Sequence, residues 1–378
     1  MKILVVSMNS IHTNRWLEQL KDSHHEIYYF EALGGSYNKK LSWVKYQHYD
    51  WKNRMGRFKG RYYLKQKFPK LHHMFLKDSA NEFKKVIDMV NPDVVHSFVF
   101  YISCVPFYKV IKERYKIKWI YSAWGNDLYF NQNDKHLKKD ILNILPKVDF
   151  LFADCNRDIK LAKEIGFKGE VLGCFPTGGG YHLSDEFELY SVANRSGIIM
   201  KGYEGSKHRA INILKALKKI NGFPLVKIFS ADESVVEFVQ ANFEQYEYRF
   251  NIYDIDKNIA HKDLMNMFNS SLIYVSNNFS DGMPNTLLEA ICNGAFPIQS
   301  NPGGASAEII THGENGLLIE DCEDIEEIKR HISTALTTQN LIHKAFDKNL
   351  KVREKLEYYT IKNQVLEKYK IVENNLEC

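Results

Sequence analysis

The chain has 378 residues, which predicts two domains or one large domain because domains usually hold roughly 100–200 residues. Hydrophobic residues make up 44% and charged residues 26%, which excludes fibrous, collagen-like and largely disordered classes. The net charge of +5 is unevenly distributed: residues 39–77 contain twelve Lys or Arg and one acid, so this stretch carries +11 and the remainder −6. A globally basic nucleic-acid-binding protein is disfavoured, and one basic surface is favoured.

The sequence also lacks several class-defining segments. No stretch approaches the roughly 18 apolar residues of a membrane-spanning helix, and the N-terminus lacks the apolar region of a signal peptide. The six cysteines are scattered, without a C-x-x-C pair. This usage favours reduced thiols in a cytosolic protein over a disulfide framework or a zinc site.

In the first half of the chain, short apolar runs alternate with longer amphipathic segments, which is typical of parallel α/β architecture. The predicted strands are Ile3–Val6, Glu26–Phe30, Val94–Ser97, Trp119–Ser122 and Phe150–Ala153. The predicted helices are Asn14–Lys21, a helix opened by the capping box Ser79–Glu82 and ending before Pro92, Val105–Tyr115, Lys135–Ile144, and a helix capped by Asn156 that stops at Gly166.

A glycine-rich hinge candidate, Pro176–Gly180, precedes a second series of alternating segments. The predicted strands there are Gly197–Met200, Val226–Ser230, Arg249–Ile252, Leu272–Ser276 and Phe296–Ser300. The predicted helices are Arg209–Ile220, Lys262–Asn269, Asn285–Asn293, Ala305–Thr311, Asp324–Ala335 and Glu354–Lys370. We therefore expect two α/β domains, 1–185 and 186–353, with a C-terminal helix within 354–378 that could belong to either, and ligands beyond the carboxyl ends of the strands.

The most informative stretch runs from Ile273 to Glu320. A buried strand leads into a polar loop with Asp281, and Pro284 stands where a helix begins. The helix N-terminus favours anionic or hydroxyl-rich ligands, and Glu289 lies one turn further in. After a second strand, Gly303 and Gly304 allow close approach of the backbone to a ligand. Two strand–loop–helix units thus place two carboxylates and two sets of backbone N–H groups on one rim.

This stretch resembles the retaining nucleotide-sugar glycosyltransferases of glycosyltransferase family 4, which have the GT-B fold of two Rossmann-like domains. That family has an acid-x7-acid motif within E-G-x-P-x-x-L-L-E-A, followed by G-x-P-V-I, G-G before an acid, and G-x-N-G-L-L. One departure is that Asp281 replaces the usual Glu. The matching residues are Asp281, Pro284, Leu287, Leu288, Glu289, Ala290, Gly294, Pro297, Gly303, Gly304, Glu308, Gly313, Asn315, Gly316 and Leu317.

The resemblance assigns a nucleotide-sugar donor site to this stretch. Glu289 would bind the ribose hydroxyls, and Asp281 would hold the donor sugar. A solvated helix residue for Glu289 and a simple tight turn at Gly303-Gly304 are the alternatives. The other residues implied in donor binding are Gly282, Met283, Pro284, Asn285 and Thr286.

The family also pairs the donor diphosphate with an Arg and a Lys about five residues apart. Here Lys201 follows a predicted strand, and Lys207 or Arg209 would be the second cation in a longer loop. Surface solvation is the alternative for Lys207. Such cations replace a metal in stabilising the leaving diphosphate. Because we find no D-x-D motif flanked by an apolar strand, we expect metal independence and no cofactor.

The first domain would supply the acceptor side. The segment from Ser10 to Trp16 resembles an S-I-H-T-x-R-W loop of some family members, in which His12 and Arg15 would face the cleft. Trp124 and Asp127 match a W-G-x-D motif after a strand, and His96 ends another strand as a family histidine often does. A capping loop for His12 and a satisfied buried histidine for His96 are the alternatives.

The basic stretch at residues 39–77 is also rich in aromatic residues. Cations attract anionic headgroups, and Trp and Tyr suit the membrane interface. We expect docking on the anionic inner membrane surface, where a lipid-linked acceptor would lie. A solvated helix face over core aromatics and a polyanionic glycan site are alternatives, and nucleic acid is disfavoured. The aromatic residues are Trp43, Tyr46, Tyr49, Trp51, Phe58, Tyr62, Tyr63, Phe68 and Phe75.

Together these features predict a retaining glycosyltransferase that moves a sugar, from a UDP-sugar rather than a GDP-sugar, to a glycan or lipid-linked acceptor of a surface polysaccharide, lipopolysaccharide or glycolipid. It would be cytoplasmic and peripheral on the inner membrane face. A same-fold epimerase or phosphorylase and a non-catalytic sugar-nucleotide-binding module are the rivals. A dinucleotide dehydrogenase is disfavoured by the missing GxGxxG. The expected catalytic set is Asp281, Lys201, Glu289, His12 and Asp127.

Overall fold

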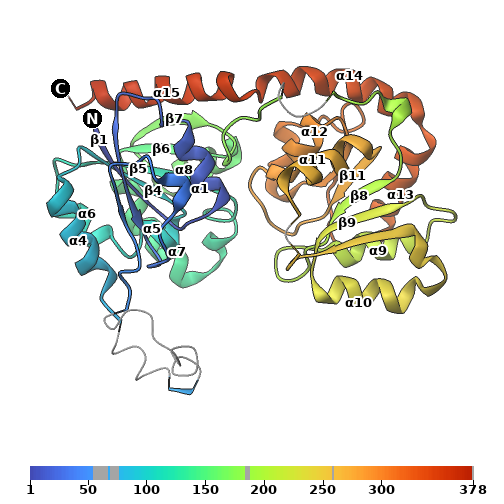
Figure 1. Cartoon of the computed structure of the whole chain (residues 1–378), viewed down its shortest axis with the longest axis horizontal. Helices are drawn as coiled ribbons and strands as arrows, with labels where there is room; N and C mark the ends of the chain where they lie inside the picture. The colour runs from blue at the N-terminus through green and yellow to red at the C-terminus, as the bar shows by residue number, and fades with distance from the viewer. Residues whose placement is uncertain (54–66, 69–75, 184–187, 258, 377–378) are drawn as a thin grey trace. The chain divides into compact units, whose positions relative to one another are not determined.

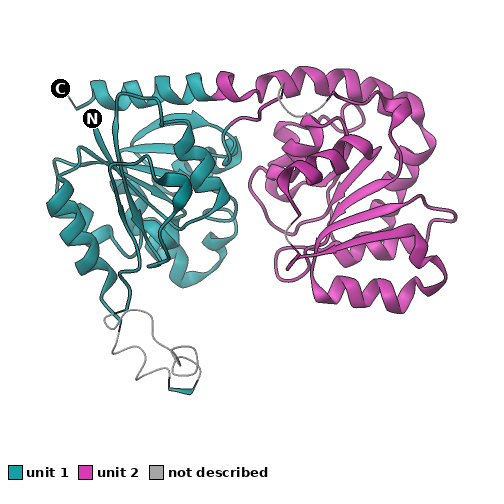
Figure 2. Cartoon of the chain, viewed as in Figure 1, with its two compact units in different colours: residues 1–179, 362–378 teal, residues 180–361 magenta. Residues whose placement is uncertain are grey.

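The computed structural model describes residues 1–53, 67–68, 76–183, 188–257 and 259–376. The chain divides into two compact units: unit 1 is Met1–Gly179 with Lys362–Cys378, and unit 2 is Gly180–Ile361 (Figure 2). The division falls inside the segment predicted as a hinge. Each unit contains one parallel sheet with interleaved helices, so the predicted α/β class is confirmed (Figure 1).

The sheet of unit 1 has seven parallel strands in the order β3-β2-β1-β4-β5-β6-β7. Its central strands are buried along their whole length, as expected when helices cover a parallel sheet. The strands are β1 (Lys2–Ser7), β2 (Glu26–Glu31), β3 (Tyr46–His48), β4 (Val94–Phe98), β5 (Lys118–Ala123), β6 (Phe150–Ala153) and β7 (Glu170–Cys174).

The described helices of unit 1 connect these strands and close its core. One side of that core is rich in rings, among them Phe30, Phe83 and Phe107. The helices are α1 (Ile11–Glu18), α4 (Ser79–Val90), α5 (Phe100–Ser103), α6 (Tyr108–Lys112), α7 (Lys135–Ile144) and α8 (Asn156–Ile165).

The sheet of unit 2 has six parallel strands in the order β10-β9-β8-β11-β12-β13. Its strands are β8 (Ile198–Lys201), β9 (Val226–Ala231), β10 (Phe250–Asp254), β11 (Ile273–Ser276), β12 (Phe296–Ser300) and β13 (Leu317–Ile319). Its helices are α9 (Ala210–Lys218), α10 (Glu233–Asn242), α11 (His261–Ser270), α12 (Asn285–Cys292), α13 (Ile325–Thr337) and α14 (Gln339–Lys355).

The last helix, α15 (Tyr358–Asn374), begins in unit 2 and docks on unit 1 from Lys362 onward (Figures 1 and 2). Tyr369 is fully buried there. Its hydroxyl accepts a hydrogen bond from Trp16 Nε1 at 3.1 Å and contacts His96 Nδ1 at 2.7 Å. The helix therefore completes the core of unit 1. No helix in the described part of the chain is long and apolar enough to cross a membrane.

Several predicted helix ends are wrong. Asp78, and not Ser79, caps α4 by accepting from the Asn81 N–H, and the predicted capping partner Glu82 instead bonds Lys85 Nζ at 2.6 Å. Asn156 is the first residue of α8, and Cys155 is its N-cap.

Other predicted helices are interrupted. The helix expected at Val105–Tyr115 is shortened to α6, Tyr108–Lys112, and a separate short helix, α5, precedes the predicted range. The segment Ala305–Thr311 forms only a short 3₁₀ turn, Ser306–Glu308. The single helix expected from Glu354 is two helices, because the backbone of Tyr181 pairs with Leu356 O at 2.8 Å and Tyr358 N at 2.9 Å between them.

Candidate active site

The candidate donor site lies at the carboxyl edge of the unit 2 sheet. Lys201 is the last residue of β8, and the loop that carries Asp281 follows its neighbour β11. That loop leads into α12, so strand order alone brings a cation, a carboxylate and a helix N-terminus to one edge.

Lys201 is surrounded by acids. Burial lowers the pKa of Lys201, while the charges of Asp281, Glu289 and Asp232 raise it. Its ammonium also lies over the Tyr203 ring, 4.1 Å from the centroid, as in a cation–π contact. The predicted cation and both motif carboxylates are therefore within electrostatic reach of one another.

Asn278 holds Asp281 in place. Its amide Nδ2 donates to Asp281 Oδ2 at 3.0 Å, and its Oδ1 contacts His208 Nδ1 at 2.9 Å. Its backbone N–H donates to Ser300 Oγ at 2.7 Å, which ties the loop to the end of β12. Burial lowers the pKa of His208, which favours a neutral ring that donates to the Asn278 amide oxygen. Sequence reasoning missed Asn278 and His208 because neither belongs to the recognised motif.

The loop after β8 packs along the loop after β11. Phe279 N donates to Lys207 O at 2.8 Å, and Arg209 N donates to Asn277 O at 2.9 Å. Gly202 is required here, because a Cβ would lie 2.6 Å from the Ala231 Cα. The structure thus brings Lys207 and Arg209 to the same edge as Lys201.

Arg209, one of the two candidates for the second cation, has several side-chain partners. The Arg209 guanidinium forms an ion pair with Glu323, which raises the pKa of Arg209. It also donates to the carbonyls of Gly205 at 2.5 Å and His208 at 3.0 Å. Arg209 is therefore held by a carboxylate and two carbonyls, and Lys207 and Arg209 both remain candidates for a second phosphate contact.

Glu289 is buried in α12, with 6% of its surface exposed. Its Oε1 contacts His261 Nε2, at the start of α11, at 3.2 Å. The alternative of a solvated helix residue is therefore wrong. A buried carboxylate at the sheet edge can accept hydrogen bonds from a ligand's hydroxyl groups.

The first turn of α12 presents its backbone to the same edge. Pro284 is the N-cap and provides no side-chain hydrogen bond, so the helix retains the positive end that favours anions. Thr286 Oγ1 contacts the Tyr274 hydroxyl at 2.8 Å, and Tyr181 donates to Asn285 Oδ1 at 3.4 Å. Gly282 and Met283 are buried beneath this turn.

The other motif residues have more varied roles. Gly303 and Gly304 have φ of 62° and 85°, the left-handed region that favours glycine, and a Cβ on Gly304 would meet no atom within 4 Å. The left-handed backbone conformation, and not steric crowding around a Cβ, therefore accounts for the glycine at position 304. Asn315 is structural, since its Nδ2 donates to Asn349 Oδ1 at 3.0 Å and so ties the loop to α14.

In unit 1, His12 lies in the first turn of α1, with Ser10 as the N-cap. The His12 ring meets the Trp124 ring edge-on at 6.5 Å between centroids. Arg15 lies one turn further along α1 and is partly buried. The structure therefore brings His12 and Trp124 together at the end of the sheet.

Asp127 and His96 are placed as structural residues. Asp127 Oδ2 accepts from Phe100 N at 2.9 Å and Tyr121 Oη at 3.0 Å, and burial raises the pKa of Asp127 to about 7. His96 is fully buried between Ser122 Oγ at 2.8 Å and Tyr369. The hydrogen bonds of both side chains lie in the core of unit 1, so neither residue is a candidate for contact with the substrate.

Two described clusters bring three metal-ligating side chains within 4.8 Å of one another: His24, His25 and Glu373, and Asp154, Cys155 and Asp158. Neither cluster belongs to the donor edge. One D-x-D sequence, Asp254-Ile255-Asp256, begins at the last residue of β10. Only Phe250 of that strand is buried, and Asp254 forms an ion pair with Lys257 at 2.8 Å.

Two family models match the chain. The model described as Glycosyl transferases group 1 matches residues 198–360, and the model described as Glycosyl transferase 4-like matches residues 2–153. The protein is a glycosyltransferase of the group 1, family 4-like type. Its donor-edge residues from Lys201 to Glu289 all fall within the first match, and no curated protein sequence matches the glycosyltransferase significantly.

Solved structures share the GT-B fold of this glycosyltransferase. Sucrose-phosphate synthase of Thermosynechococcus elongatus aligns with a TM-score of 0.72 and 13% identity, over 99% of this chain and 100% of that one. The lipopolysaccharide outer core galactosyltransferase WaaB aligns with a TM-score of 0.69 and 15% identity, over 98% and 99%. HepE of Anabaena, in complex with UDP and glucose, gives 0.68 and 12%, over 98% and 99%.

Proposed function

We propose that this glycosyltransferase takes its sugar from a nucleotide-sugar donor bound at the unit 2 edge, with a UDP-sugar preferred. Lys201 and either Lys207 or Arg209 bind the diphosphate, Glu289 accepts from the ribose hydroxyls, and Asp281 contacts the donor sugar. The observation that carries the proposal is the convergence of Lys201, Asp281 and Glu289 beside the first turn of α12. HepE has been solved with UDP-glucose, and a pneumococcal O-GlcNAc transferase with UDP and GlcNAc, which supports a UDP-sugar.

The proposed transfer retains the anomeric configuration and uses no metal. The bond between the anomeric carbon and the diphosphate oxygen breaks, and the acceptor hydroxyl oxygen bonds to the same face of the sugar. The departing phosphate oxygen takes the acceptor's proton. Lys201 and the first turn of α12 stabilise the negative charge that develops on the diphosphate. The positive groups at this edge of the unit 2 sheet support metal independence.

The proposed acceptor is a glycan or lipid-linked sugar of a surface polysaccharide, lipopolysaccharide or glycolipid pathway, reached by a cytoplasmic enzyme peripheral on the inner membrane face. Within the basic stretch, Lys39, Lys40, Lys45 and Lys67 are exposed, as are Tyr49 and Phe68, which supports this placement. Trp51 instead packs against Phe30 in the core. Phe58, Tyr62, Tyr63 and Phe75 lie outside the described residues.

A thermal-shift panel of UDP, GDP, ADP and their sugars tests the donor proposal. We expect the largest stabilisation from UDP and UDP-sugars, because a ligand that binds only the folded state raises its stability. Equal shifts from all three nucleotides would contradict the UDP preference. Activity should persist in EDTA, and loss restored by magnesium would overturn metal independence. An epimerase would change the donor without an acceptor, whereas a transferase should release UDP in proportion to acceptor glycosylated.

A further inference from the structure

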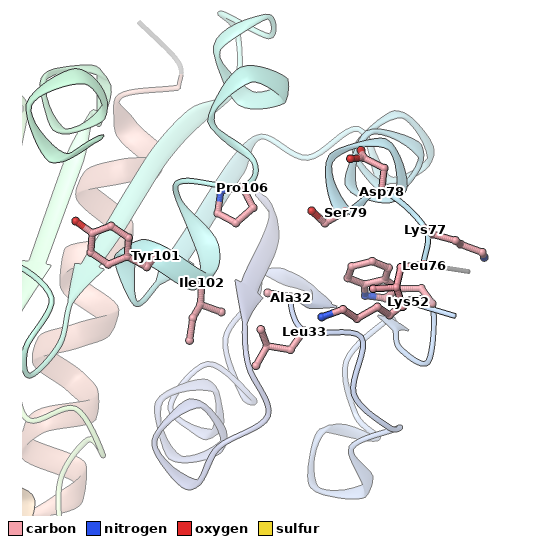
Figure 3. A pocket seen from close by; sticks show the side chains of 11 residues that line it. Ala32, Leu33, Lys52, Leu76, Lys77, Asp78, Ser79, Tyr101, Ile102 and Pro106 are labelled. Atoms are coloured by element: carbon pink, nitrogen blue, oxygen red, sulfur yellow. The ribbon is translucent and has the colours of Figure 1, made fainter. Parts of the chain in front are cut away.

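Unit 1 contains a cavity of about 540 Å³ that none of the donor-site residues line. This volume is in the usual range for pockets that bind small molecules. Its walls come from the end of β2, the residues before α4, and α5 (Figure 3). Leu33, Trp51, Ile102 and Pro106 make one part of the lining apolar. Its charged residues are Lys52, Lys77 and Asp78, and the Asp78 carboxylate is engaged as the N-cap of α4, where it accepts from the Asn81 N–H.

The backbone of Lys52 is fixed by its neighbours. Trp51 Nε1 donates to Glu31 O at 2.6 Å, which anchors the preceding residue in the core. Lys77 N donates to Lys52 O at 2.8 Å. Gly34 has φ of +69°, and a Cβ there would lie 2.4 Å from the Lys52 Cβ, so only glycine allows this close approach.

The Lys52 side chain has no charged partner within the part of the chain that the structure describes. It forms no ion pair or side-chain hydrogen bond with any residue that the structure describes. Figure 3 shows it extending across the cavity toward Ala32 and Leu33. Lys77, by contrast, is directed away from the cavity and lies 3.9 Å from the Glu82 carboxylate. A positioned ammonium among apolar walls is suited to a ligand with one anionic group and an apolar or saccharide body.

We propose that this cavity binds a phosphate group carried by the acceptor, with Lys52 as its counter-ion. The Ser79 hydroxyl, at the start of α4, is the neutral polar group that we assign as a further donor to the phosphate. Leu33, Ile102 and Pro106 contact the body next to the phosphate. The assignment to the acceptor rests on the proposed transferase reaction, whereas phosphate binding in the cavity does not. A lipid-borne phosphate and a free sugar phosphate share this chemistry.

Calorimetric titration of the full chain tests the cavity. The probes are farnesyl phosphate below its micellar concentration, glucose 6-phosphate, and the neutral compounds farnesol and glucose. We expect a phosphate probe to bind and its neutral counterpart to bind at least about tenfold more weakly, because the charge-assisted contact is lost. Binding of farnesyl phosphate alone would assign a lipid-borne source, and binding of glucose 6-phosphate alone a free sugar phosphate. Failure of both would overturn the proposal.

Matched variants separate the cavity from general surface charge. Lys52→Ala should weaken binding of the phosphate probe at least about tenfold, and Lys52→Arg should preserve it within about threefold. Lys45→Ala removes an exposed lysine of the same stretch and should have no effect. Leu33→Asp, at an exposed wall residue, should also weaken binding. Equal affinity of Lys52→Ala and Lys45→Ala would overturn the assignment.

Measuring UDP binding distinguishes a failure of the cavity proposal from a failure of the proposed donor function. UDP should bind the wild-type chain and Lys52→Ala with equal affinity, because Lys52 belongs to unit 1 and the donor edge to unit 2. If UDP binds but the phosphates do not, only the cavity proposal falls. If the phosphates bind through Lys52 but UDP does not bind, the donor proposal falls and the cavity remains a phosphate site.

Discussion

At the residue scale, Lys201 is the cation whose surroundings are best defined. Asp281, Glu289 and Asp232 all raise its pKa against the effect of burial, so its ammonium is poised among acids that a diphosphate would partly displace as its partners. Lys201→Ala should weaken UDP binding at least about tenfold, because a charge-assisted contact is lost. Titration calorimetry measures the change. The control is Lys218→Ala, at an exposed lysine of α9, and an unchanged UDP affinity in Lys201→Ala would refute the role.

The buried carboxylate of Glu289 gives a second prediction. Glu289→Gln keeps the volume of the side chain but replaces one acceptor oxygen by an amide donor. We expect kcat/KM for sugar transfer to fall by about 100-fold, because two hydroxyl contacts of the donor would be disturbed. Glu237→Gln, at an exposed residue of α10, is the matched control. Near-normal transfer by Glu289→Gln would remove Glu289 from the donor site.

Asp127 predicts a pH dependence of stability. Burial raises its pKa from 3.8 to about 7, so between these values the folded state binds this proton more strongly than the unfolded state. The free energy of unfolding therefore decreases as the pH rises from about 4 to 7. Asp127→Asn should remove part of this decrease and gain stability relative to wild type at pH 8. Denaturant unfolding at pH 5 and pH 8 measures it, and parallel pH profiles would contradict the prediction.

Sequence alone located residues at this scale but not the direction of their side chains. The sequence predicts His96 at the end of one strand and Asp127 after another, as for ligand-binding residues. In the structure, His96 lies within β4, and the hydroxyls of Ser122, Tyr369 and Tyr121 bond the two side chains in the core. The partner Tyr369 lies 273 residues from His96 in the chain. A contact at that separation leaves no local pattern.

At the scale of elements, the buried strands were the most predictable features. Runs such as Phe150–Ala153 are apolar throughout because both faces of a parallel sheet are covered. The elements β3, β7, β13, α5, α10 and α14 were not predicted. Strand β13 has only three residues, which is too short for a recognisable pattern. It is a strand because it pairs with β12. The break between α14 and α15 depends on the backbone of Tyr181, which is equally remote in sequence.

The docking of α15 predicts a loss of stability. Tyr369→Phe removes the hydroxyl that contacts Trp16 Nε1 and His96 Nδ1, and leaves both buried groups without that partner. The free energy of unfolding should fall by about 1–3 kcal/mol. Denaturant unfolding checks this value. Tyr359→Phe, on an exposed side chain of the same helix, should change it by less than about 0.5 kcal/mol. Equal effects of the two variants would show that the buried contacts contribute little.

At the scale of the whole molecule, charge is the property that composition predicts best. The basic stretch at residues 39–77 carries +11 in a chain whose remainder carries −6. We expect the protein to sediment with liposomes that contain anionic lipid at low salt, and to be released as salt screens the attraction. Neutral phosphatidylcholine liposomes are the control. Failure to sediment with anionic liposomes would contradict membrane docking.

The division of the chain also has a consequence for synthesis. Most of unit 1 precedes unit 2 in the chain and is translated before it, but Trp16 and His96 gain their contacts with Tyr369 only when α15 arrives. Unit 2 needs no residue beyond Ile361. Because domains generally fold as units during translation, the half that leaves the ribosome first is the last to be completed. A premature stop before α15 would therefore damage the unit that is translated earlier and leave the sheet of the other unit whole.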